Sequence, residues 1–370
     1  MERGWNSSSK NTVSLQIPAT YLNATNHEQF TNHFNNTLPE EMLVPQESDN
    51  YLSEASRLLR QGIQQQQASQ LTGAVESLQE SLALFQAFGD IPRQAQALSC
   101  LALVAYTSGD YKSAISYSRQ CLTLTKEISD VRVELQALSH LGNSYRHLGD
   151  NQKAIEYLQE CLKIAQQMQD RRCQVAALNN LGLVHKALNE VERAIEYQEQ
   201  SLEIVRKFQD NWGEEQVLKN LGNAWYALGD YPKAIAYYEQ CVKIARSLNN
   251  RRSASQVLKN LGNACYALGE YAKAITYYED RLELSRELKD KRSQEQSLGS
   301  LGVACEALGD YNKAITYYKQ RLELARLIKD RRSEQQALAS LKVACYALGD
   351  YAKAMQYQQK SQTTGSHPRE

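Results

Sequence analysis

The sequence lacks the features that mark membrane, secreted and nucleic-acid-binding proteins. It contains no run of 18 apolar residues, the minimum expected of a membrane-spanning helix. It also has no charged segment followed by an apolar segment and a cleavage site, the pattern of a signal peptide. Its 42 Lys and Arg residues balance its 42 Asp and Glu residues, so bulk charge argues against a nucleic-acid partner. These absences predict a cytoplasmic protein with no membrane insertion.

The motifs of enzymes are missing as well. The chain has no Walker loop, no dinucleotide-binding fingerprint and no metal-spaced cluster, and no Cys-x-x-Cys pair suited to zinc or redox chemistry. His140, His147 and His185 are predicted to lie singly on helical surfaces, without a nucleophile and an orienting acid beside them. The sequence therefore predicts no catalytic activity, no cofactor and no metal site.

Cysteine is present, but not in a pattern that favours disulfides. Equivalent positions on stacked helices lie roughly 8–10 Å apart, which is beyond the reach of a disulfide. We therefore expect the cysteines at such positions to be small buried hydrophobic residues in a reducing compartment. Six of the eight cysteines occupy two such positions: Cys121, Cys161 and Cys241, and then Cys265, Cys305 and Cys345.

What the chain does contain is a 40-residue unit repeated without insertion over residues 51–370. A fixed period between 20 and 50 residues is typical of a solenoid, in which each unit buries its apolar face against its neighbours. The scarcity of proline, 6 in 370 residues, agrees with a helical repeat. The period is clearest in two leucine positions three residues apart: Leu178, Leu218, Leu258, Leu298 and Leu338, and then Leu181, Leu221, Leu261, Leu301 and Leu341.

Within the unit at 211–250, the spacing of apolar residues predicts two helices. Helix A is expected from about residue 213 to 228 and helix B from about 231 to 248, each with an apolar stripe at helical spacing. Gly229 suits the left-handed residue that ends a helix, and Asp230 suits the N-cap of the next. Gly222 on helix A and Ala234 on helix B are expected to let the two backbones approach closely. The pattern is helix–turn–helix throughout.

These residues resemble the tetratricopeptide repeat. The match rests on Leu221-Gly222, Ala234, Tyr238 and a small residue at Cys241, and it recurs over residues 51–370. The unit is six residues longer than the common 34-residue form and lacks the proline usual near its end, as in the long repeats of spindle-orientation adaptors and bacterial signalling scaffolds. The resemblance implies an all-α, right-handed superhelical solenoid of about eight repeats whose helices A line a concave groove.

The resemblance also allows one class of ligand, the C-terminal tails of chaperones, to be checked against the sequence. Chaperone-binding members clamp a C-terminal carboxylate with charged and amide residues on three successive helices A. Lys219, Asn223 and Asn260 match the first three clamp positions, but the last two fall on Gln296 and Ser300, which carry no charge. The clamp is therefore incomplete, which argues against capture of a chaperone tail.

Residues 1–50 differ from the rest of the chain. They are rich in Asn, Ser and Thr, carry a net charge of −4 and show no helical period, so they are predicted to form a disordered acidic and polar tail. The terminal repeats are expected to act as caps, with polar residues where inner repeats have apolar ones. The predicted repeats are 51–90 (a degenerate cap), 91–130, 131–170, 171–210, 211–250, 251–290, 291–330 and 331–370 (a terminal cap with a short tail).

A second, polar stripe on helix A is the candidate binding surface. Stacking the repeats should align these stripes into a ladder of amide, ammonium and phenol groups able to bind an extended peptide. Two interpretations remain open: the ladder contacts a ligand, or its amides only bridge neighbouring repeats. The predicted groove residues are Arg146, Asn180, Lys186, Lys219, Asn220, Asn223, Tyr226, Lys259, Asn260, Asn263 and Tyr266.

Three functions are compatible with this surface. The favoured one is a non-enzymatic scaffold or adaptor that binds an extended, acidic peptide or a helix of a partner protein in its groove. The alternative is a regulatory sensor whose acidic residues 1–50 occupy the groove, which belongs to a repeat region of net charge +4. An RNA-binding repeat protein is the least favoured, because the net charge is zero and no variable two-residue code is present.

Overall fold

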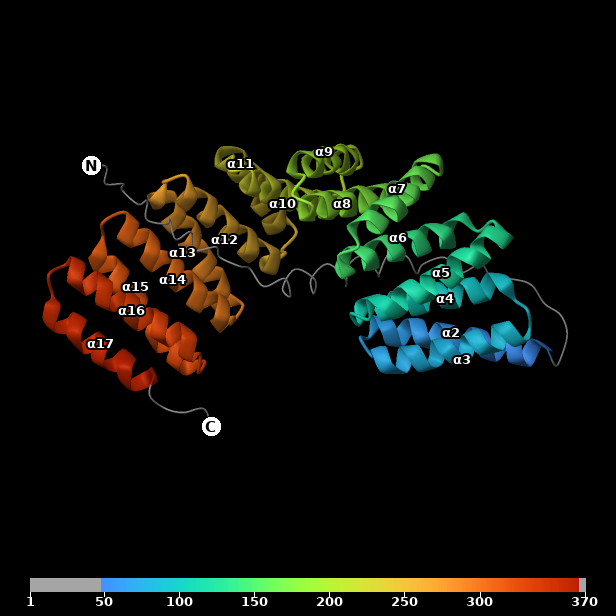
Figure 1. Cartoon of the computed structure of the whole chain (residues 1–370), viewed down its shortest axis with the longest axis horizontal. Coiled ribbons are helices and arrows are strands. Elements are labelled where there is room, and N and C mark those ends of the chain that lie inside the picture. The colour runs from blue at the N-terminus through green and yellow to red at the C-terminus, as the bar shows by residue number, and fades with distance from the viewer. Residues whose placement is uncertain (1–47, 366–370) are drawn as a thin grey trace, which may run out of the picture. The chain divides into compact units, whose positions relative to one another are not determined.

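The computed structural model describes residues 48–365, and every regular element in that range is an α-helix (Figure 1). Sixteen helices form eight consecutive helical hairpins within this range, which confirms the predicted all-α repeat solenoid. The helices are α2 (Ser48–Gln67), α3 (Leu71–Ala87), α4 (Ile91–Thr107), α5 (Tyr111–Ile128), α6 (Val131–Leu148), α7 (Asn151–Gln167), α8 (Arg171–Ala187), α9 (Val191–Lys207), α10 (Asn211–Ala227), α11 (Tyr231–Ser247), α12 (Arg251–Ala267), α13 (Tyr271–Glu287), α14 (Lys291–Ala307), α15 (Tyr311–Leu327), α16 (Arg331–Ala347) and α17 (Tyr351–Gly365).

The even-numbered helices are the predicted helices A and the odd-numbered ones the helices B. In the fifth repeat, α10 begins two residues before the predicted start, and both helices end one residue before the predicted end. The first helix, α2, begins at Ser48, three residues before the predicted boundary of the repeat region. The tail predicted at residues 1–50 otherwise lies outside the described residues.

Capping explains where the helices of one repeat begin and end. Gly229 adopts the left-handed conformation, with φ +80°, and the Asp230 carboxylate accepts a hydrogen bond from the backbone N–H of Lys233 at 3.1 Å, as predicted. Between repeats, Asn249 takes the left-handed role at φ 54° and Asn250 accepts from the Ser253 N–H at 3.2 Å. The residues found where the common repeat has proline are therefore N-caps of the next helix A: Asp210, Asn250, Asp290 and Asp330.

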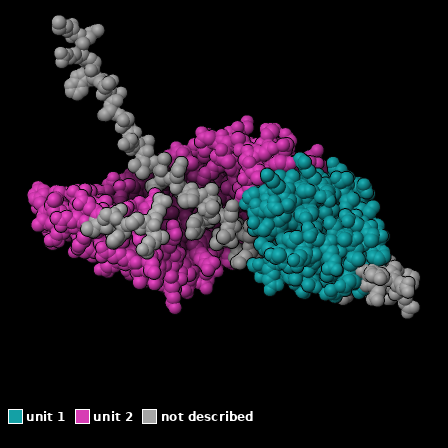
Figure 2. All heavy atoms as spheres, turned by 60° about the horizontal axis from the view of Figure 1, so that its bottom comes forward, with its two compact units in different colours: residues 1–144 teal, residues 145–370 magenta. Residues whose placement is uncertain are grey.

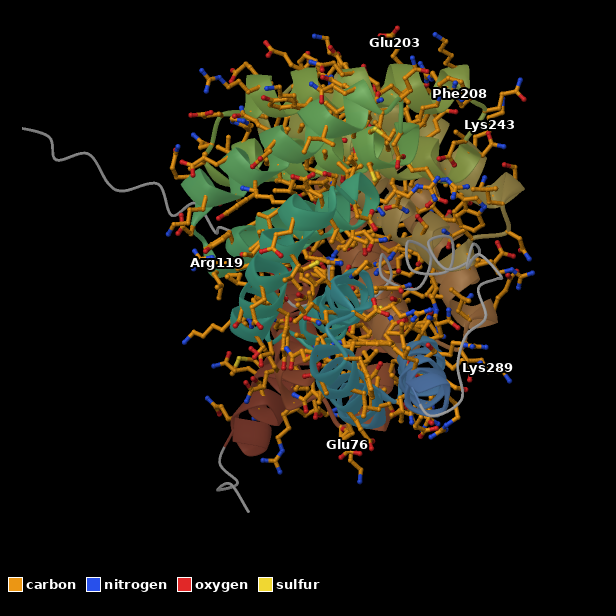
Figure 3. All side chains as sticks on the ribbon, turned by 90° about the vertical axis from the view of Figure 1, so that its right-hand side faces the viewer. Glu76, Arg119, Glu203, Phe208, Lys243 and Lys289 are labelled. Carbon is orange, nitrogen blue, oxygen red and sulfur yellow. The ribbon has the colours of Figure 1, made fainter. Side chains whose placement is uncertain are left out.

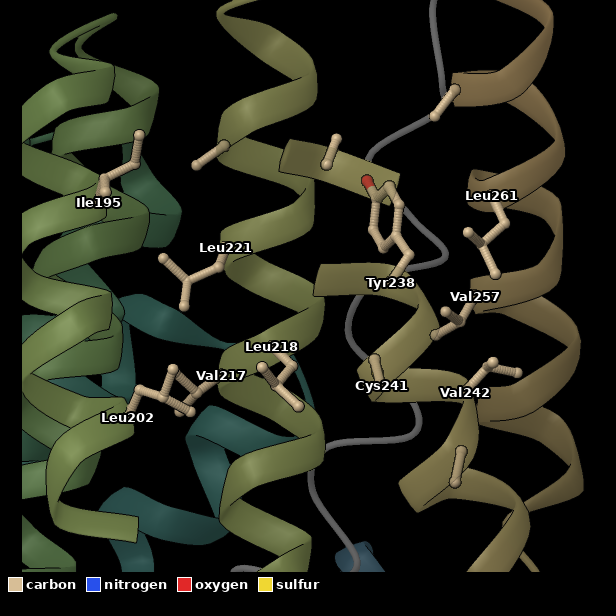
Figure 4. Packing of buried hydrophobic residues seen from close by; sticks show 14 of the residues in the cluster. Ile195, Leu202, Val217, Leu218, Leu221, Tyr238, Cys241, Val242, Val257 and Leu261 are labelled. Atoms are coloured by element: carbon tan, nitrogen blue, oxygen red, sulfur yellow. The ribbon is translucent and has the colours of Figure 1, made fainter. Parts of the chain in front are cut away.

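The core of each hairpin is built from the predicted leucines. Leu218 and Leu221 of α10 are fully buried and pack with Tyr238 and Cys241 of α11 (Figure 4). Cysteines at the two repeat positions are buried, as predicted, and all are free thiols. Burial raises the pKa of the Cys241 thiol to about 12, which makes it an unreactive core residue rather than a nucleophile.

Gly222 makes room for a side chain of helix B. A Cβ built on Gly222 would meet the ring of Tyr238 at 2.5 Å. The same contact recurs in the next two repeats, where Gly262 faces Tyr278 and Gly302 faces Tyr318. The predicted approach of the glycine to the alanine backbone is found in the preceding repeat, where a Cβ built on Gly182 would lie 3.2 Å from the Ala194 carbonyl oxygen.

The chain divides into two compact units, the first ending at Ser144 and the second starting at Tyr145 (Figure 2). Unit 1 contains α2–α5 and most of α6, with a core that includes Leu78, Phe85, Leu98 and Leu101. Unit 2 contains the end of α6 and α7–α17. All of the predicted groove residues belong to unit 2.

Helices A and B of unit 2 have different neighbours. Each helix A from α10 to α16 packs against the helix B of its own repeat and the helix B of the preceding repeat. Helix α10 also contacts α8 and α12 directly, whereas no comparable contact joins two helices B among the described residues of unit 2. The helices α8, α10 and α12 are thus closely spaced, and in Figure 1 α9 and α11 lie on the outer side of α8 and α10. Exposed charged residues such as Glu203 and Lys243 project from the helices B away from the ribbon (Figure 3). We call the surface formed by α8, α10, α12, α14 and α16 the helix-A face.

No helix within residues 48–365 combines the length and the apolar character needed to cross a bilayer.

Candidate peptide-binding face

The predicted polar stripe follows α10 and α12 at helical spacing, in two matching rows. Lys219 and Asn223 of α10 and Lys259 and Asn263 of α12 are all half-buried, and Tyr226 is 37% exposed. The structure therefore places the residues of the two central repeats on one face, in equivalent positions of neighbouring helices. Whether this face binds a ligand remains a prediction.

The asparagines are hydrogen-bonded to one another and to the core tyrosines. The Asn223 Oδ1 atom accepts hydrogen bonds from the Tyr238 hydroxyl at 2.6 Å and from the Asn260 amide of the next repeat at 3.1 Å. The Tyr278 hydroxyl donates to Asn263 Oδ1 in the same way, at 2.8 Å. Bridging between repeats, one of the two interpretations that the sequence left open, is thus a real function of these amides. It leaves Asn223 Nδ2 without a hydrogen bond among the described residues, and that donor can still serve a ligand.

The lysines of the ladder are poorly compensated. Lys219 Nζ donates to the neutral Gln216 Oε1 at 2.7 Å, and Lys259 Nζ forms no hydrogen bond or ion pair within the described residues. Burial lowers the pKa of Lys186, Lys219 and Lys259 below that of a free lysine, because removing an ammonium group from water disfavours its charged form. A carboxylate bound beside Lys219 or Lys259 would offset this cost.

The remaining predicted residues are held by local contacts. Tyr226 packs against Tyr231 with ring centroids 5.3 Å apart, and Tyr266 packs against Tyr271 at 5.2 Å. Asn180 donates to a carbonyl of its own helix at 2.9 Å, and Asn220 lies 3.5 Å from Gln198 Oε1. Arg146 Nη2 lies 2.9 Å from His147 Nε2, on the last turn of α6. The structure thus unites α10 and α12 into one polar patch, while Arg146 and Asn180 are engaged within their own helices.

Two arginines from helices B also reach the helix-A face. Arg281 and Arg321 stand where earlier repeats carry Cys or Ser, a pattern that predicts half-buried side chains paired with a glutamate of a neighbouring repeat. Arg321 does form an ion pair, with Nε 2.6 Å from Glu295 Oε1 of its own repeat, whereas Arg281 is 3% exposed and has no carboxylate within ion-pair distance among the described residues. The signal in the sequence was an arginine where earlier repeats carry Cys or Ser, but the sequence did not show which arginine would be neutralised.

His185 differs from its predicted place on a helical surface. It is buried, with 4% exposure, because its ring stacks on Tyr197 at 5.2 Å and its Nδ1 lies 2.8 Å from Glu190 Oε2. It lines a cavity of about 450 Å³ between α7, α8 and α9. None of the predicted groove residues lines this cavity, and no group of three or more His, Cys, Asp and Glu residues suited to a metal ion occurs in the described part of the chain.

Comparison with solved structures supports the fold. A signal transduction ATPase with numerous domains and a tetratricopeptide repeat sensor, from Pyrococcus horikoshii, aligns with a TM-score of 0.66 at 18% identity, over 86% of this chain and 53% of that one. The chain therefore spans about half the length of that ATPase. The apo quorum sensor NprR from B. thuringiensis aligns with a TM-score of 0.58 at 12% identity over 92% of both chains. BtubC from P. vanneervenii gives 0.51 at 22% identity, over 66% of this chain and 94% of that one.

Sequence comparison supplies the family. No curated protein sequence matches the chain significantly. One model of the tetratricopeptide repeat matches residues 133–207, 214–287 and 288–363, and a second model of this repeat matches residues 94–130. Since the first model alone covers more than half of the residues, the chain belongs to the tetratricopeptide repeat family.

Proposed function

We propose that this protein is a non-enzymatic interaction scaffold whose helix-A face binds an extended, acidic segment of a partner protein. The observation that carries the proposal is the state of Lys219 and Lys259. Both ammonium groups are half-buried on equivalent positions of neighbouring helices, and neither lies within ion-pair distance of a carboxylate among the described residues. A partly buried cation that has no ion-pair partner is costly to keep, and an acidic ligand would supply that partner.

The surroundings of the two lysines suit an extended peptide. Amides such as Asn223 and Asn263 alternate with the lysines and can bond to a peptide backbone, while Tyr226 and Tyr266 offer apolar area with a polar end. Two of the proteins with a similar fold are described as a signal transduction ATPase with a tetratricopeptide repeat sensor and as a quorum sensor. A recognition role for this face agrees with those descriptions.

The test begins with selection of 12-residue peptides from a random display library on the full chain. We expect enrichment of Asp and Glu, and we expect Lys219→Gln combined with Lys259→Gln to weaken the selected peptides at least tenfold. Lys163→Gln combined with Lys243→Gln is the matched control, because these exposed lysines lie on α7 and α11 and change the net charge equally. Equal loss in both double variants, or selection of peptides without acidic residues, would refute the proposal.

Glutamine is a better replacement than glutamate at these positions. The Lys219 ammonium lies close enough to the buried Glu215 for their charges to interact, so a carboxylate at 219 would repel it and destabilise the fold. The Lys259 ammonium interacts with the charge of Arg281, and a carboxylate at 259 would neutralise that arginine. Circular dichroism and a melting curve for each variant separate lost binding from lost structure.

A further inference from the structure

Arg281 and Arg321 occupy equivalent positions in consecutive repeats and make one equivalent contact. Each side chain extends from a helix B to the following helix A, where a guanidinium Nη2 donates to a glutamine of the helix-A face. Arg281 Nη2 lies 3.0 Å from Gln296 Oε1, and Arg321 Nη2 lies 2.9 Å from Gln336 Oε1. Both guanidinium groups therefore come to the edge of the same face, next to an exposed glutamine.

The two arginines differ in how their charge is compensated. Arg321 forms an ion pair with Glu295 on helix A of its own repeat. The equivalent residue in the repeat of Arg281, 40 positions earlier, is Ser255, which carries no charge. The hydrogen-bond partners of Arg281 are therefore neutral: Gln296, and Ser297 Oγ at 3.2 Å from Nη1. Its Nε atom is buried without a hydrogen bond. Arg281 thus carries a buried positive charge that the fold leaves unpaired.

Nearby carboxylates do not provide the missing partner. Asp290 and Glu295 are close enough to interact with the charge of Arg281, but Asp290 caps α14 by accepting from the Ser293 N–H at 3.0 Å, and Glu295 is bound to Arg321. Burial lowers the pKa of Arg281 to about 10, so the group stays charged at neutral pH. Its charge also acts on Lys259, whose pKa it lowers further. Two cations that form no ion pair among the described residues therefore lie close enough for their charges to interact.

We propose that Arg281 and Lys259 form the seat for one Asp or Glu side chain of the bound partner, and that Gln296 Oε1 occupies this seat in the free protein. This inference rests on the proposed function and names the group of the ligand that the face selects. The amide oxygen of Gln296 already marks where an oxygen acceptor meets the Arg281 Nη2 atom. A carboxylate in its place forms a charge-assisted hydrogen bond, which is roughly twice as strong as a neutral one.

Access to the seat depends on Gln296. Arg281 itself is buried, but Gln296, which accepts from its Nη2 atom, is exposed, so a ligand would reach this atom by displacing a surface side chain. Gln296 belongs to the position at which the carboxylate-clamp pattern of the family expects a charge and this chain has none. In this chain the positive charge near that position belongs to Arg281 of α13, which is a helix B.

Substitution of the glutamines tests whether a carboxylate supplied by the protein itself can occupy the seat. Gln296→Glu places a carboxylate beside Arg281 without changing the side-chain shape, so it should raise the melting temperature and block the acidic peptide. Gln336→Glu is the matched control, because Arg321 already has Glu295 as its partner; it should give no such rise and keep the peptide bound. If Gln336→Glu stabilises the protein as much as Gln296→Glu does, Arg281 is not the unpaired charge and the inference is wrong.

Removal of the arginine tests whether the acidic peptide depends on the guanidinium group. Arg281→Ser restores the residue type of Ser201, which is fully buried at the equivalent position. The probes are the fluorescein-labelled acidic peptide selected on the full chain and its copy with Asn and Gln in place of Asp and Glu. We expect Arg281→Ser and Gln296→Glu to weaken the acidic peptide at least tenfold, and we expect the neutral copy to bind both variants as weakly as it binds the wild type.

The outcomes separate the two proposals. If the wild-type chain prefers the acidic peptide but Arg281→Ser and Gln296→Glu bind it as tightly as the wild type, the seat is wrong and the scaffold proposal stands. If the wild-type chain shows no preference for the acidic peptide over its neutral copy, the proposed function fails and the seat fails with it. A selective loss in the two variants, with retention in Gln336→Glu, supports both.

Discussion

At the scale of single residues, a glycine contact recurs in the central repeats. Gly222, Gly262 and Gly302 each lie under a tyrosine ring of the paired helix B. In the last repeat the equivalent residues are Lys342, in place of the glycine, and Gln358, in place of the tyrosine. The glutamine alone does not account for the lysine, because Gly182 also faces a glutamine, and a Cβ built on Gly182 would meet Gln198 Nε2 at 2.5 Å. Lys342 has no structural explanation.

This contact predicts the cost of a small substitution. Gly222→Ala should lower the free energy of unfolding by about 1–3 kcal/mol, the usual penalty for overpacking a filled core, although alanine has the higher helix propensity. Urea denaturation followed by circular dichroism measures the change. Adding Tyr238→Leu should make the alanine nearly neutral, because it removes the ring that the methyl group meets. An equal cost of the alanine with and without the ring would show that the ring is not the cause.

At the scale of helices, the first residue outside each helix decides how well it is capped. Asp230, Asp310 and Asp350 each accept a hydrogen bond from the backbone N–H three residues later. Glu190 and Glu270 stand at the same position, and neither makes a side-chain capping bond. The extra methylene group of glutamate directs the carboxylate past the backbone, toward Arg193 and Lys273 respectively.

This difference predicts a stabilising substitution. Glu270→Asp should raise the stability of unit 2 by about 1 kcal/mol, the typical contribution of an N-cap, since aspartate can also keep an ion pair with the lysine three residues later, as Asp310 does with Lys313. The reverse change, Asp310→Glu, should be destabilising by the same reasoning. Thermal melting of both variants beside the wild type checks the pair. The opposite signs are required, and a change in the same direction in both variants would contradict the prediction.

Helix positions and caps could be predicted because the same residues mark them in every clear copy of the repeat. Any one copy is ambiguous, but leucines, a glycine and an aspartate at fixed offsets in successive copies constrain the helix ends to within two residues. The contacts across helices were harder to predict. That the atoms nearest to Gly222 belong to the Tyr238 ring depends on the rotation of one helix against the other, which the period does not specify.

The candidate site was predictable in part for the same reason. The stripe with Lys219 and Asn223 follows from helical spacing within one segment, and the Asn260 amide bonds to Asn223 across neighbouring repeats, while binding by this stripe stays a prediction. The unpaired charge of Arg281 depends on residues 15 and 26 positions away in sequence: Gln296, and Ser255 where the next repeat has Glu295. Comparing the charge at equivalent positions of consecutive repeats would have found it. The burial of His185 could not be predicted because it depends on Tyr197 of the following helix and on Glu190, which directly precedes that helix.

At the scale of the whole molecule, the remaining question is what competes for the helix-A face. Residues 1–50 carry a net charge of −4 and the repeat region +4, so the chain contains an acidic segment of its own. The proposed scaffold function assigns the face to a partner, whereas the alternative of a self-regulated sensor assigns it to this segment. The two assignments differ in what happens to affinity when the segment is removed.

We expect a chain that begins at Ser48 to bind the selected acidic peptide with unchanged affinity, because a face reserved for a partner is not occupied beforehand. Under self-regulation, removal would increase the affinity, since an internal competitor reduces the fraction of protein that is free to bind. Fluorescence anisotropy at low and at high salt measures both chains, and screening by salt should weaken the peptide equally in each. A tighter complex of the shortened chain at low salt, with the difference vanishing at high salt, would instead assign the face to the chain's own acidic residues.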